Sequence, residues 1–226
     1  MRNHPNTAMI FCAGRGTRMK ALTSDRPKPM IQVAGRPLVD HALAQIGSVE
    51  HRVANLHYLP DMLKEHLNSA GIETIFEEVL LETGGGLRNA LPHLKADVVF
   101  TVNTDAVWKG PMAAEILAEA WDPEKMDALL LTVPFGRTHG HLGQGDFDIL
   151  PGGRLARGRG SVYTGVQILK TSALNNINET CFSLNLVWER LFQTGRIFGV
   201  EYPGHWCDVG HPEGVEIAER LLKDAN

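Results

Sequence analysis

The chain has 226 residues, of which 43% are hydrophobic, and a formal net charge of -4 from 22 basic and 26 acidic residues. The apolar share is large enough for a buried core, and the lack of a basic excess argues against a nucleic-acid partner. The three cysteines, Cys12, Cys181 and Cys207, are far apart, which favours the reducing cytoplasm over a disulfide framework. The start MRNHPNT is polar, and no long apolar run follows it, so we expect neither secretion nor a membrane span.

Short apolar runs alternate with helical patterns through the first half of the chain. We predict strands at residues 8–12, 53–56, 74–76, 98–102 and 128–133, and helices at residues 37–46, 60–69, 87–91 and 111–120. The run 98–102 (VVFTV) carries the strongest strand signal, because it is apolar and rich in β-branched residues. This alternation indicates α/β layers around a mostly parallel sheet, with ligand loops at the carboxyl ends of the strands.

The second half of the chain has a different order of predicted strands and helices. We predict strands at residues 146–150, 162–169 and 197–202, and helices at residues 184–192 and 212–222. The stretch PGGRLARGRG is rich in turn residues and separates the first two of these strands. We see no linker and no repeat, so we expect one domain over residues 1–226, with a nucleotide-binding first half (about 8–135) and a sugar-facing second half (about 136–226).

A glycine-rich loop, residues 13–19 (AGRGTRM), follows the first predicted strand. Glycines let backbone N–H groups approach a phosphate closely, and Arg15 and Arg18 add positive charge beside them. The loop lacks the Gly-Lys-Ser/Thr ending of a P-loop, and Met19 stands where the Rossmann spacing needs glycine. Taken alone, the loop fits an ordinary strand-to-helix turn equally well.

A lysine between two prolines, Pro27-Lys28-Pro29, comes shortly afterwards. The prolines restrict the backbone and suit the presentation of one ammonium group, although a stiff surface loop would have the same composition. Together with the glycine loop and Leu22-Thr23, this segment resembles the signature of sugar-1-phosphate nucleotidyltransferases. Ala21 replaces the proline that this family usually has before Leu-Thr.

Two aspartates complete the resemblance. Asp105 follows the strand 98–102, where α/β proteins place ligand residues, although it could also cap a helix. The resemblance makes Asp105 a metal ligand, with Thr104 in place of the usual glycine, and the Trp-x-Asp-x-Gly pattern at 206–210 gives the second ligand, Asp208. Mg²⁺ needs few protein ligands when substrate phosphates and water supply the rest. A histidine and aspartate site for a transition metal is the weaker alternative here.

Further segments resemble the parts of this family that contact base and sugar. The stretch 82–86 (ETGGG) resembles the base-binding segment, although an unliganded helix start would also fit. Residues 163–166 and 182–185 resemble sugar-pocket segments, with Asn185 where the family usually has a charge. The arginines of the turn at 154–159 fit a solvated loop, and we leave them outside the predicted site.

The resemblance implies a Rossmann-like, three-layer α/β sandwich with a mixed central sheet, the nucleotide-diphospho-sugar transferase fold. It implies a magnesium-dependent enzyme that joins a nucleoside triphosphate to a sugar 1-phosphate. The implied catalytic residues are Arg18, Lys28 and Asp105, and the implied metal ligands are Asp105 and Asp208. The implied nucleotide contacts are Ala13, Gly14, Gly16, Thr17, Glu82, Gly85 and Asn103, and the implied sugar contacts are Gly165 and Asn185.

The segment 139–147 (HGHLGQGDF) is similar to a stretch in the N-acetylmuramate 1-phosphate uridylyltransferase branch, and the short chain lacks the β-helix repeats of longer relatives. We therefore expect UTP and N-acetylmuramic acid 1-phosphate as substrates, and a role in peptidoglycan recycling. Three alternatives stay open: a guanylyltransferase for mannose 1-phosphate or another sugar enzyme of the class, a cytidylyltransferase for a phospho-alcohol, and a regulatory subunit that senses sugar nucleotides without turnover. The oligomeric state stays open as well.

Overall fold

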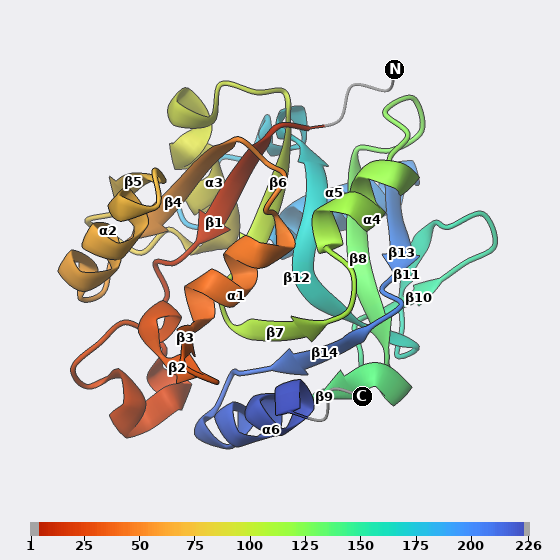
Figure 1. The fold of residues 1–226 in the computed structure, drawn as a ribbon. Coiled ribbons are helices and arrows are strands. Elements are labelled where there is room, and N and C mark those ends of the chain that lie inside the picture. Colours follow the sequence, from red (N-terminus) through yellow and green to blue (C-terminus); the bar gives the residue numbers. More distant parts are fainter. Residues whose placement is uncertain (1–4, 224–226) are drawn as a thin grey trace.

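The computed structural model describes residues 5–223, so the first four residues of the polar start lie outside the described residues. Its main feature is a nine-stranded sheet with the order β11-β10-β12-β6-β1-β4-β5, to which β8 and β13 are added beside β12 (Figure 1). Helices cover both faces of this sheet, so the chain has the predicted three-layer α/β architecture.

The half of the sheet built first along the chain is parallel. β1 (Thr7–Phe11) lies between β4 (His51–Leu56) and β6 (Val98–Asn103), and β5 (Glu73–Phe76) follows β4 at the edge. Helical crossovers connect these strands, which is what parallel pairing requires. The carboxyl ends of β1 and β6 therefore point the same way and bring their following loops together.

The other half is mostly antiparallel. β12 (Ser161–Lys170) runs antiparallel to β6, β8 (Ala128–Pro134) and β10 (Phe147–Ile149), and β11 (Leu155–Arg157) pairs antiparallel with β10. Only β13 (Ile197–Glu201) adds a parallel pair, with β8. The expectation of a mostly parallel sheet was therefore wrong for this half, because no helix crosses over between β8 and β12. The mixed central sheet implied by the family resemblance is confirmed.

Alternating residues of the strands feed two separate cores. Ala8 and Ile10 of β1 face α1 (Leu38–Gln45), α2 (Pro60–Ser69) and α4 (Ala113–Ala120), whereas Met9 faces α3 (Glu82–Leu94) and α5 (Leu184–Thr194). All three side chains are fully buried. The alternation follows from the two-residue period of a strand with helices on both sides.

A smaller three-stranded sheet lies across the carboxyl end of the main sheet (Figure 1). It consists of β7 (Ala106–Lys109), β14 (His205–Asp208) and β9 (Thr138–His139), and it packs with α6 (Pro212–Lys223) around Val107 and Cys207. β14 pairs with β7 so that Asp208 lies opposite Ala106, and Val209 N donates to Asp105 O at 2.8 Å. This pairing brings two distant parts of the sequence to one place.

The remaining elements are short. β2 (Gln32–Val33) and β3 (Arg36–Pro37) form a hairpin, and short 3-10 helices occupy Thr17–Thr23, where the helix is kinked at Lys20, and Lys28–Met30, Phe135–Arg137 and Thr171–Leu174. None of the helices within residues 5–223 is long and apolar enough to cross a membrane.

The predicted helix at 60–69 has the same bounds in the structure, whereas the predicted helix at 87–91 is the middle of a longer helix, α3. α3 begins at Glu82 and includes Gly84 to Gly86, which we had placed before the helix. Glycine is a poor helix former, but a β-carbon at Gly84 would overlap the ring of Phe182. Close packing of the segment at 180–182 therefore explains Gly84 and Gly85, and Gly86 packs instead against the side chains of Asn55 and Glu77.

Candidate active site

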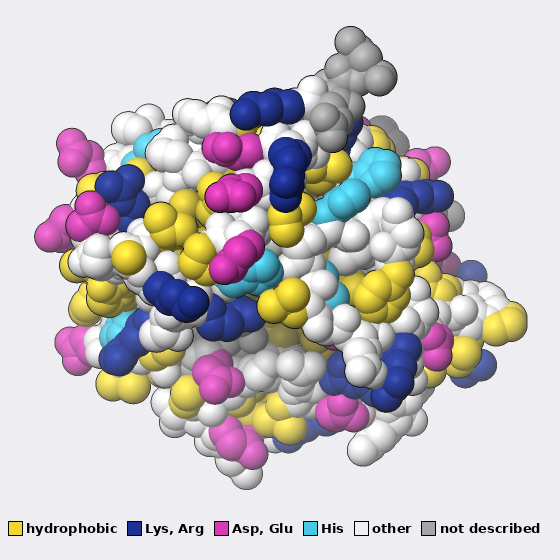
Figure 2. Space-filling view, turned by 90° about the horizontal axis from the view of Figure 1, so that it is seen from below, with side chains coloured by type: hydrophobic (Ala, Val, Ile, Leu, Met, Phe, Trp, Pro, Cys, Tyr) yellow, Lys and Arg dark blue, Asp and Glu magenta, His cyan; other side chains and the backbone are white. Residues whose placement is uncertain are grey.

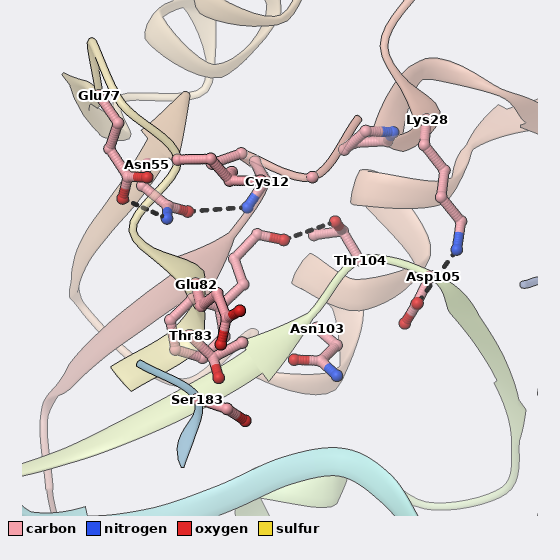
Figure 3. A pocket seen from close by; sticks show the side chains of 15 residues that line it. Cys12, Lys28, Asn55, Glu77, Glu82, Thr83, Asn103, Thr104, Asp105 and Ser183 are labelled. Carbon is pink, nitrogen blue, oxygen red and sulfur yellow. Dashed lines mark hydrogen bonds and ion pairs between the residues drawn. The ribbon is translucent and has the colours of Figure 1, made fainter. Parts of the chain in front are cut away.

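Two adjoining cavities open at the carboxyl ends of β1 and β6, and they share a wall. The first has a volume of about 360 Å³ and the second about 310 Å³. The shared wall consists of Thr83, Asn103, Asp105 and Ser183. Figure 3 shows these four side chains around the first cavity, with Asp105 at one end. Two ligands held in the two cavities would meet at this wall.

The predicted site residues divide between the two cavities. The first cavity is lined by Ala13, Gly14, Lys28 and Glu82. The second is lined by Arg18, Gly165, Asn185 and Asp208. Both are lined by Asn103 and Asp105. Gly16, Thr17 and Gly85 line neither. The backbone N–H of Gly85 donates to Phe182 O at 3.0 Å, so this donor is already used within the protein.

Lys28 and Asp105 form an ion pair at the shared wall. Lys28 Nζ lies 3.0 Å from Asp105 Oδ2, and the two side chains are 11% and 35% exposed (Figure 3). Burial raises the pKa of Asp105, but the charge and hydrogen bond of Lys28 together with the charge of Arg18 outweigh that effect and hold the pKa below its usual value. Asp105 is therefore an anion at neutral pH, and Lys28 points its ammonium group at the junction of the cavities.

Asp208 adds a second carboxylate next to this pair. Burial and the negative charge of Asp105 raise the pKa of Asp208, and the charges of Lys28, His141 and Arg18 oppose them only in part. His141 Nδ1 lies 3.8 Å from Asp208 Oδ2, and the buried Nε2 of the same ring has no hydrogen-bond partner among residues 5–223. A β-carbon at Gly210 would come within 2.8 Å of Asp208 Oδ1, which explains the glycine of the Trp-x-Asp-x-Gly pattern.

This pair of carboxylates suits a divalent cation. Two like charges repel each other at the ends of neighbouring strands, and an ion between them would remove that cost. Within the part of the chain that the structure describes, no group of three or more histidine, cysteine or acidic side chains is arranged to hold a metal. A cation on Asp105 and Asp208 would thus take its other ligands from phosphate oxygens and water, which is the arrangement Mg²⁺ favours.

A buried hydrogen-bond chain holds the glycine loop above the first cavity. Cys12 N donates to Asn55 Oδ1 at 2.9 Å, and Asn55 Nδ2 donates to Glu77 Oε1 at 2.7 Å (Figure 3). Glu77 Oε2 in turn accepts from Leu81 N at 3.2 Å, just before α3. Asn55 and Glu77 are 4% and 2% exposed, so the loop after β1 and the start of α3 are tied to one rigid support.

Asn55 and Glu77 were not among the residues predicted from the sequence. The signal available was a polar residue at the end of a buried strand, Asn55, followed by an acidic residue at the end of the next one. Such residues sit where ligand loops begin in α/β proteins. Their pairing depends on β4 and β5 lying side by side, which the sequence does not reveal.

Glu82 occupies the start of α3 in a left-handed backbone conformation, with φ of +58°. This conformation is costly for a residue with a side chain, and such strain is concentrated at functional sites. Thr83 Oγ1 accepts from Leu184 N at 2.9 Å, and Phe182 O accepts from the N–H groups of Gly84 and Gly85. The helix start is thereby clamped to the segment that leads into α5.

The second cavity is bounded by a bulge in β12. The register between β12 and β8 shifts between Tyr163 and Gln167, and Gly165 lies in the shifted stretch with φ of +89°. A β-carbon at Gly165 would come within 2.9 Å of Asn103 Cβ, so glycine allows the strand to approach the shared wall. On the same side, the ring of Tyr163 packs edge-on against Trp188 with their centroids 5.0 Å apart.

Arg157 also lines the second cavity, although we had left the arginines of this turn outside the site. Its Nη2 donates to Asn185 Oδ1 at 2.9 Å and to Glu189 Oε1 at 2.8 Å, and its Nε donates to Glu189 Oε1 at 3.0 Å. Our interpretation of this turn as a purely solvated loop does not hold for Arg157. The sequence offers no signal that separates it from Arg154 and Arg159.

Charge is mixed over the face seen from below in Figure 2. Lysine and arginine side chains alternate with acidic ones there, and no broad area of one sign stands out. The binding of an anionic ligand therefore depends on individual cations inside the cavities.

Comparisons with known proteins agree with this geometry. A family model described as "MobA-like NTP transferase domain" matches residues 8–196. The chain is 36% identical over its full length to the full-length N-acetylmuramate alpha-1-phosphate uridylyltransferase of Caulobacter vibrioides. It is 30% identical to the enzyme of the same name from Neisseria meningitidis, over 95% of this chain and 97% of that one. The structure of the inositol-1-phosphate CTP transferase from T. maritima shares the fold, with a TM-score of 0.77, 17% identity and full coverage of both chains.

Proposed function

We propose that this chain, which belongs to the MobA-like NTP transferase family, joins UTP to N-acetylmuramic acid 1-phosphate and releases pyrophosphate. The chain is a sugar-1-phosphate nucleotidyltransferase, as its relatives indicate. The observation that carries the proposal is the pair of cavities that meet at Asn103 and Asp105. The choice of UTP and the muramic sugar rests on the two uridylyltransferases that resemble the chain along nearly all of its length. We also propose that the whole chain, residues 1–226, forms one catalytic domain.

In the proposed reaction, the triphosphate lies in the first cavity and the sugar 1-phosphate in the second. An oxygen of the sugar phosphate attacks the α-phosphorus, a new phosphorus–oxygen bond forms, and the bond to the β-phosphate oxygen breaks. UDP-N-acetylmuramic acid and pyrophosphate are the products. The attacking oxygen already carries negative charge at neutral pH, so no protein group has to accept a proton. Catalysis then consists of alignment and neutralisation of charge.

Two cations of the protein serve this chemistry in the proposal. Lys28 lines the first cavity, pairs with Asp105 of the shared wall, and stabilises the phosphate groups where the bond forms and breaks. Arg18 lines the second cavity, which shares Asp105 with the first, and in the proposal it holds the leaving pyrophosphate. The backbone of Ala13 and Gly14 borders the triphosphate, and Gly16 and Thr17 shape the loop behind it.

Asp105 and Asp208 would hold Mg²⁺. When bound, the ion supplies positive charge that neutralises the phosphates and draws electron density from the α-phosphorus. The two aspartates bind and orient this charge, while Lys28 keeps Asp105 ionised and turned toward the junction.

The base and the sugar are placed at opposite ends in this proposal. Glu82 and its neighbours at the start of α3 border the nucleobase, and Gly165 and Asn185 border the sugar. We further propose a cytoplasmic enzyme, since Cys12, Cys181 and Cys207 are all free, which fits a reducing compartment.

Pyrophosphate release separates this proposal from a sensing subunit. The purified chain, incubated with UTP, N-acetylmuramic acid 1-phosphate and Mg²⁺, should release pyrophosphate and form the sugar nucleotide in equal amounts. A mixture without the sugar phosphate is the control. Binding of both ligands without pyrophosphate release would favour the regulatory subunit instead.

A further inference from the structure

The second cavity carries a charged group that the nucleotidyl transfer itself does not require. Arg157 lies on β11, three strands from β6 in the order β11-β10-β12-β6. β10, the neighbour of β11, pairs with β12 only at Ser161, whereas β6, which leads to Asp105, pairs with β12 over residues 166–170. Figure 1 shows β10 and β11 on the side of β12 that faces away from β1. The cavity thus has a reacting end and a distant, cationic end.

The guanidinium of Arg157 is fixed in place from several sides. It lies over an aromatic platform, with its central carbon 5.0 Å from the ring centre of Phe147, 5.3 Å from Phe192 and 5.9 Å from Trp188. Glu189 and Asn185 hold its Nε and Nη2 from the α5 side. A cation stacked on aromatic rings and held by hydrogen bonds has little rotational freedom left. Its remaining donors therefore have a defined direction before any ligand arrives.

One edge of this guanidinium is available for a ligand. Nη1 donates to no acceptor among residues 5–223, while Nε and Nη2 are both engaged with α5. The Arg157 side chain is 42% exposed and borders the cavity. Nη1 can donate a charge-assisted hydrogen bond to a carboxylate oxygen, which is stronger than a bond between neutral groups. The group is thus suited to a ligand carboxylate at the end of the cavity far from the reacting phosphate.

The other charged groups of the cavity do not fill this role. Asp105 and Asp208 lie at the reacting end, and the charge of Arg18 acts on both of them. Asp146 accepts a hydrogen bond from Tyr163 N at 2.9 Å and would repel an anion. Arg157 is the cation left for a second anionic group of the sugar.

We infer that Arg157 is the specificity residue for the sugar: it binds the carboxylate of the lactyl ether and distinguishes N-acetylmuramic acid 1-phosphate from N-acetylglucosamine 1-phosphate. This inference rests on the proposed function, because the lactyl carboxylate is what separates the two sugars. Asn185 belongs to the same arrangement, since its side-chain oxygen accepts from Arg157 Nη2 and helps to orient the guanidinium.

The test compares two sugars on matched variants. We would measure kcat/KM for N-acetylmuramic acid 1-phosphate and for N-acetylglucosamine 1-phosphate, with UTP and Mg²⁺, in the wild type, Arg157→Gln and Arg159→Gln. Arg159 is exposed in the same turn and lines neither cavity, so its substitution controls for the loss of one positive charge. Arg157→Gln should lose at least about tenfold in kcat/KM for the muramic substrate, the effect of one lost charged hydrogen bond. It should leave the glucosamine substrate close to the wild-type value, and Arg159→Gln should change neither.

A second variant keeps the inference testable if Arg157→Gln does not fold. Glu189→Gln retains an oxygen that can accept from Arg157 and removes the carboxylate that competes with the ligand. The preference for the muramic substrate should rise in this variant, and a fall would contradict the role of Arg157.

The outcomes separate this inference from the proposed function. Suppose that the wild type prefers the muramic substrate but Arg157→Gln lowers kcat/KM equally for both sugars. Arg157 then acts on the shared phosphate or on folding, and the inference fails while the proposed function stands. The same holds if Arg157→Gln keeps the wild-type preference. If the wild type shows no preference for the muramic substrate, the proposed function fails and the inference fails with it.

Discussion

The backbone of Gly16 lies directly against the side chain of Lys28. A β-carbon at position 16 would stand 2.8 Å from Lys28 Cβ and 3.0 Å from Thr23 Cγ2, and the residue has φ of +63°. The glycine loop and the Pro-Lys-Pro segment are therefore one packed unit, and Gly16 acts by placing the lysine that meets Asp105.

Substituting Gly16 by alanine should disturb both folding and activity. The left-handed conformation alone costs a residue with a side chain about 1–2 kcal/mol, and the new methyl group would push Lys28 away from Asp105. We expect a lower melting temperature and a loss of at least about tenfold in kcat/KM, since small displacements of an aligned group are costly.

Gly35→Ala is the matched control. Gly35 has φ of +75° but no atom within 4 Å of the position a β-carbon would take. It should lose stability from the backbone strain and keep its kcat/KM. An equal loss of activity in both variants would show that the contact between Gly16 and Lys28 is unimportant.

The two cations at the cavities should be essential for turnover. Arg18→Ala and Lys28→Ala should each lower kcat/KM by at least about a hundredfold, the typical effect of losing one preorganised charge at a reacting phosphate. Lys28→Arg should recover only part of this, because a planar fork does not replace a compact ammonium group. Lys64→Ala, on the exposed side of α2, is the control. Near-normal kinetics of Lys28→Ala would show that the Pro-Lys-Pro segment has only a structural role.

The two aspartates should have equal effects on activity and different effects on stability. Asp105→Asn and Asp208→Asn should both lose most turnover in Mg²⁺. In EDTA, however, Asp208→Asn should be at least as stable as the wild type, because the folded state holds the charged form of Asp208 at a cost. Asp105→Asn removes the partner of Lys28 and should not gain stability.

Thermal unfolding in EDTA and pyrophosphate release in Mg²⁺ measure these two effects separately. Activity that survives in either variant, or in the wild type with EDTA, would contradict a metal held by this pair.

Acid sensitivity should depend on an ion pair remote from the cavities. Asp127 Oδ2 accepts from Arg196 Nε at 2.7 Å, and Lys170 Nζ lies 3.0 Å from Asp127 Oδ1. Burial raises the pKa of Asp127, but these two partners outweigh it and lower the pKa below its usual value. The folded state thus favours the carboxylate. Its stabilisation is complete above the unfolded-state pKa of about 3.9 and is lost as the pH falls through the lower, folded-state pKa.

Asp127→Asn should therefore lower the free energy of unfolding at pH 7 by about 1 kcal/mol, with the difference from the wild type shrinking below about pH 4. Urea unfolding at pH 7 and pH 3 measures this, and kcat/KM at pH 7 should stay unchanged. A difference that is the same at both pH values would mean that the carboxylate charge is not responsible.

Residues close together in the sequence were easier to predict than contacts between distant segments. The strand at 98–102 and the helix at 60–69 carry local signals, an apolar β-branched run and an amphipathic pattern, and both are present. The glycine loop, Lys28, Asp105 and Asp208 were predicted from short motifs and the family resemblance that these motifs carry, and Lys28, Asp105 and Asp208 all line the two cavities. The strands β7 and β14 are four residues each, and their pairing joins segments about 100 residues apart, which no local pattern predicts.

The same reason explains the residues that were missed. Asn55 and Glu77 matter because they bond to each other and because Asn55 also accepts from Cys12, across three segments of the chain. Arg157 looks like its neighbours in an arginine-rich turn until Phe147 and Glu189 are seen around it.

The most direct test of the proposed reaction compares two complete substrate pairs on the wild-type chain. We would measure kcat/KM by pyrophosphate release for UTP with N-acetylmuramic acid 1-phosphate, and for GTP with mannose 1-phosphate. We predict a clear preference for the first pair, because a pocket shaped for a pyrimidine excludes guanine and leaves its polar groups unpaired. A preference of roughly tenfold or more for the guanosine and mannose pair would contradict the substrate assignment.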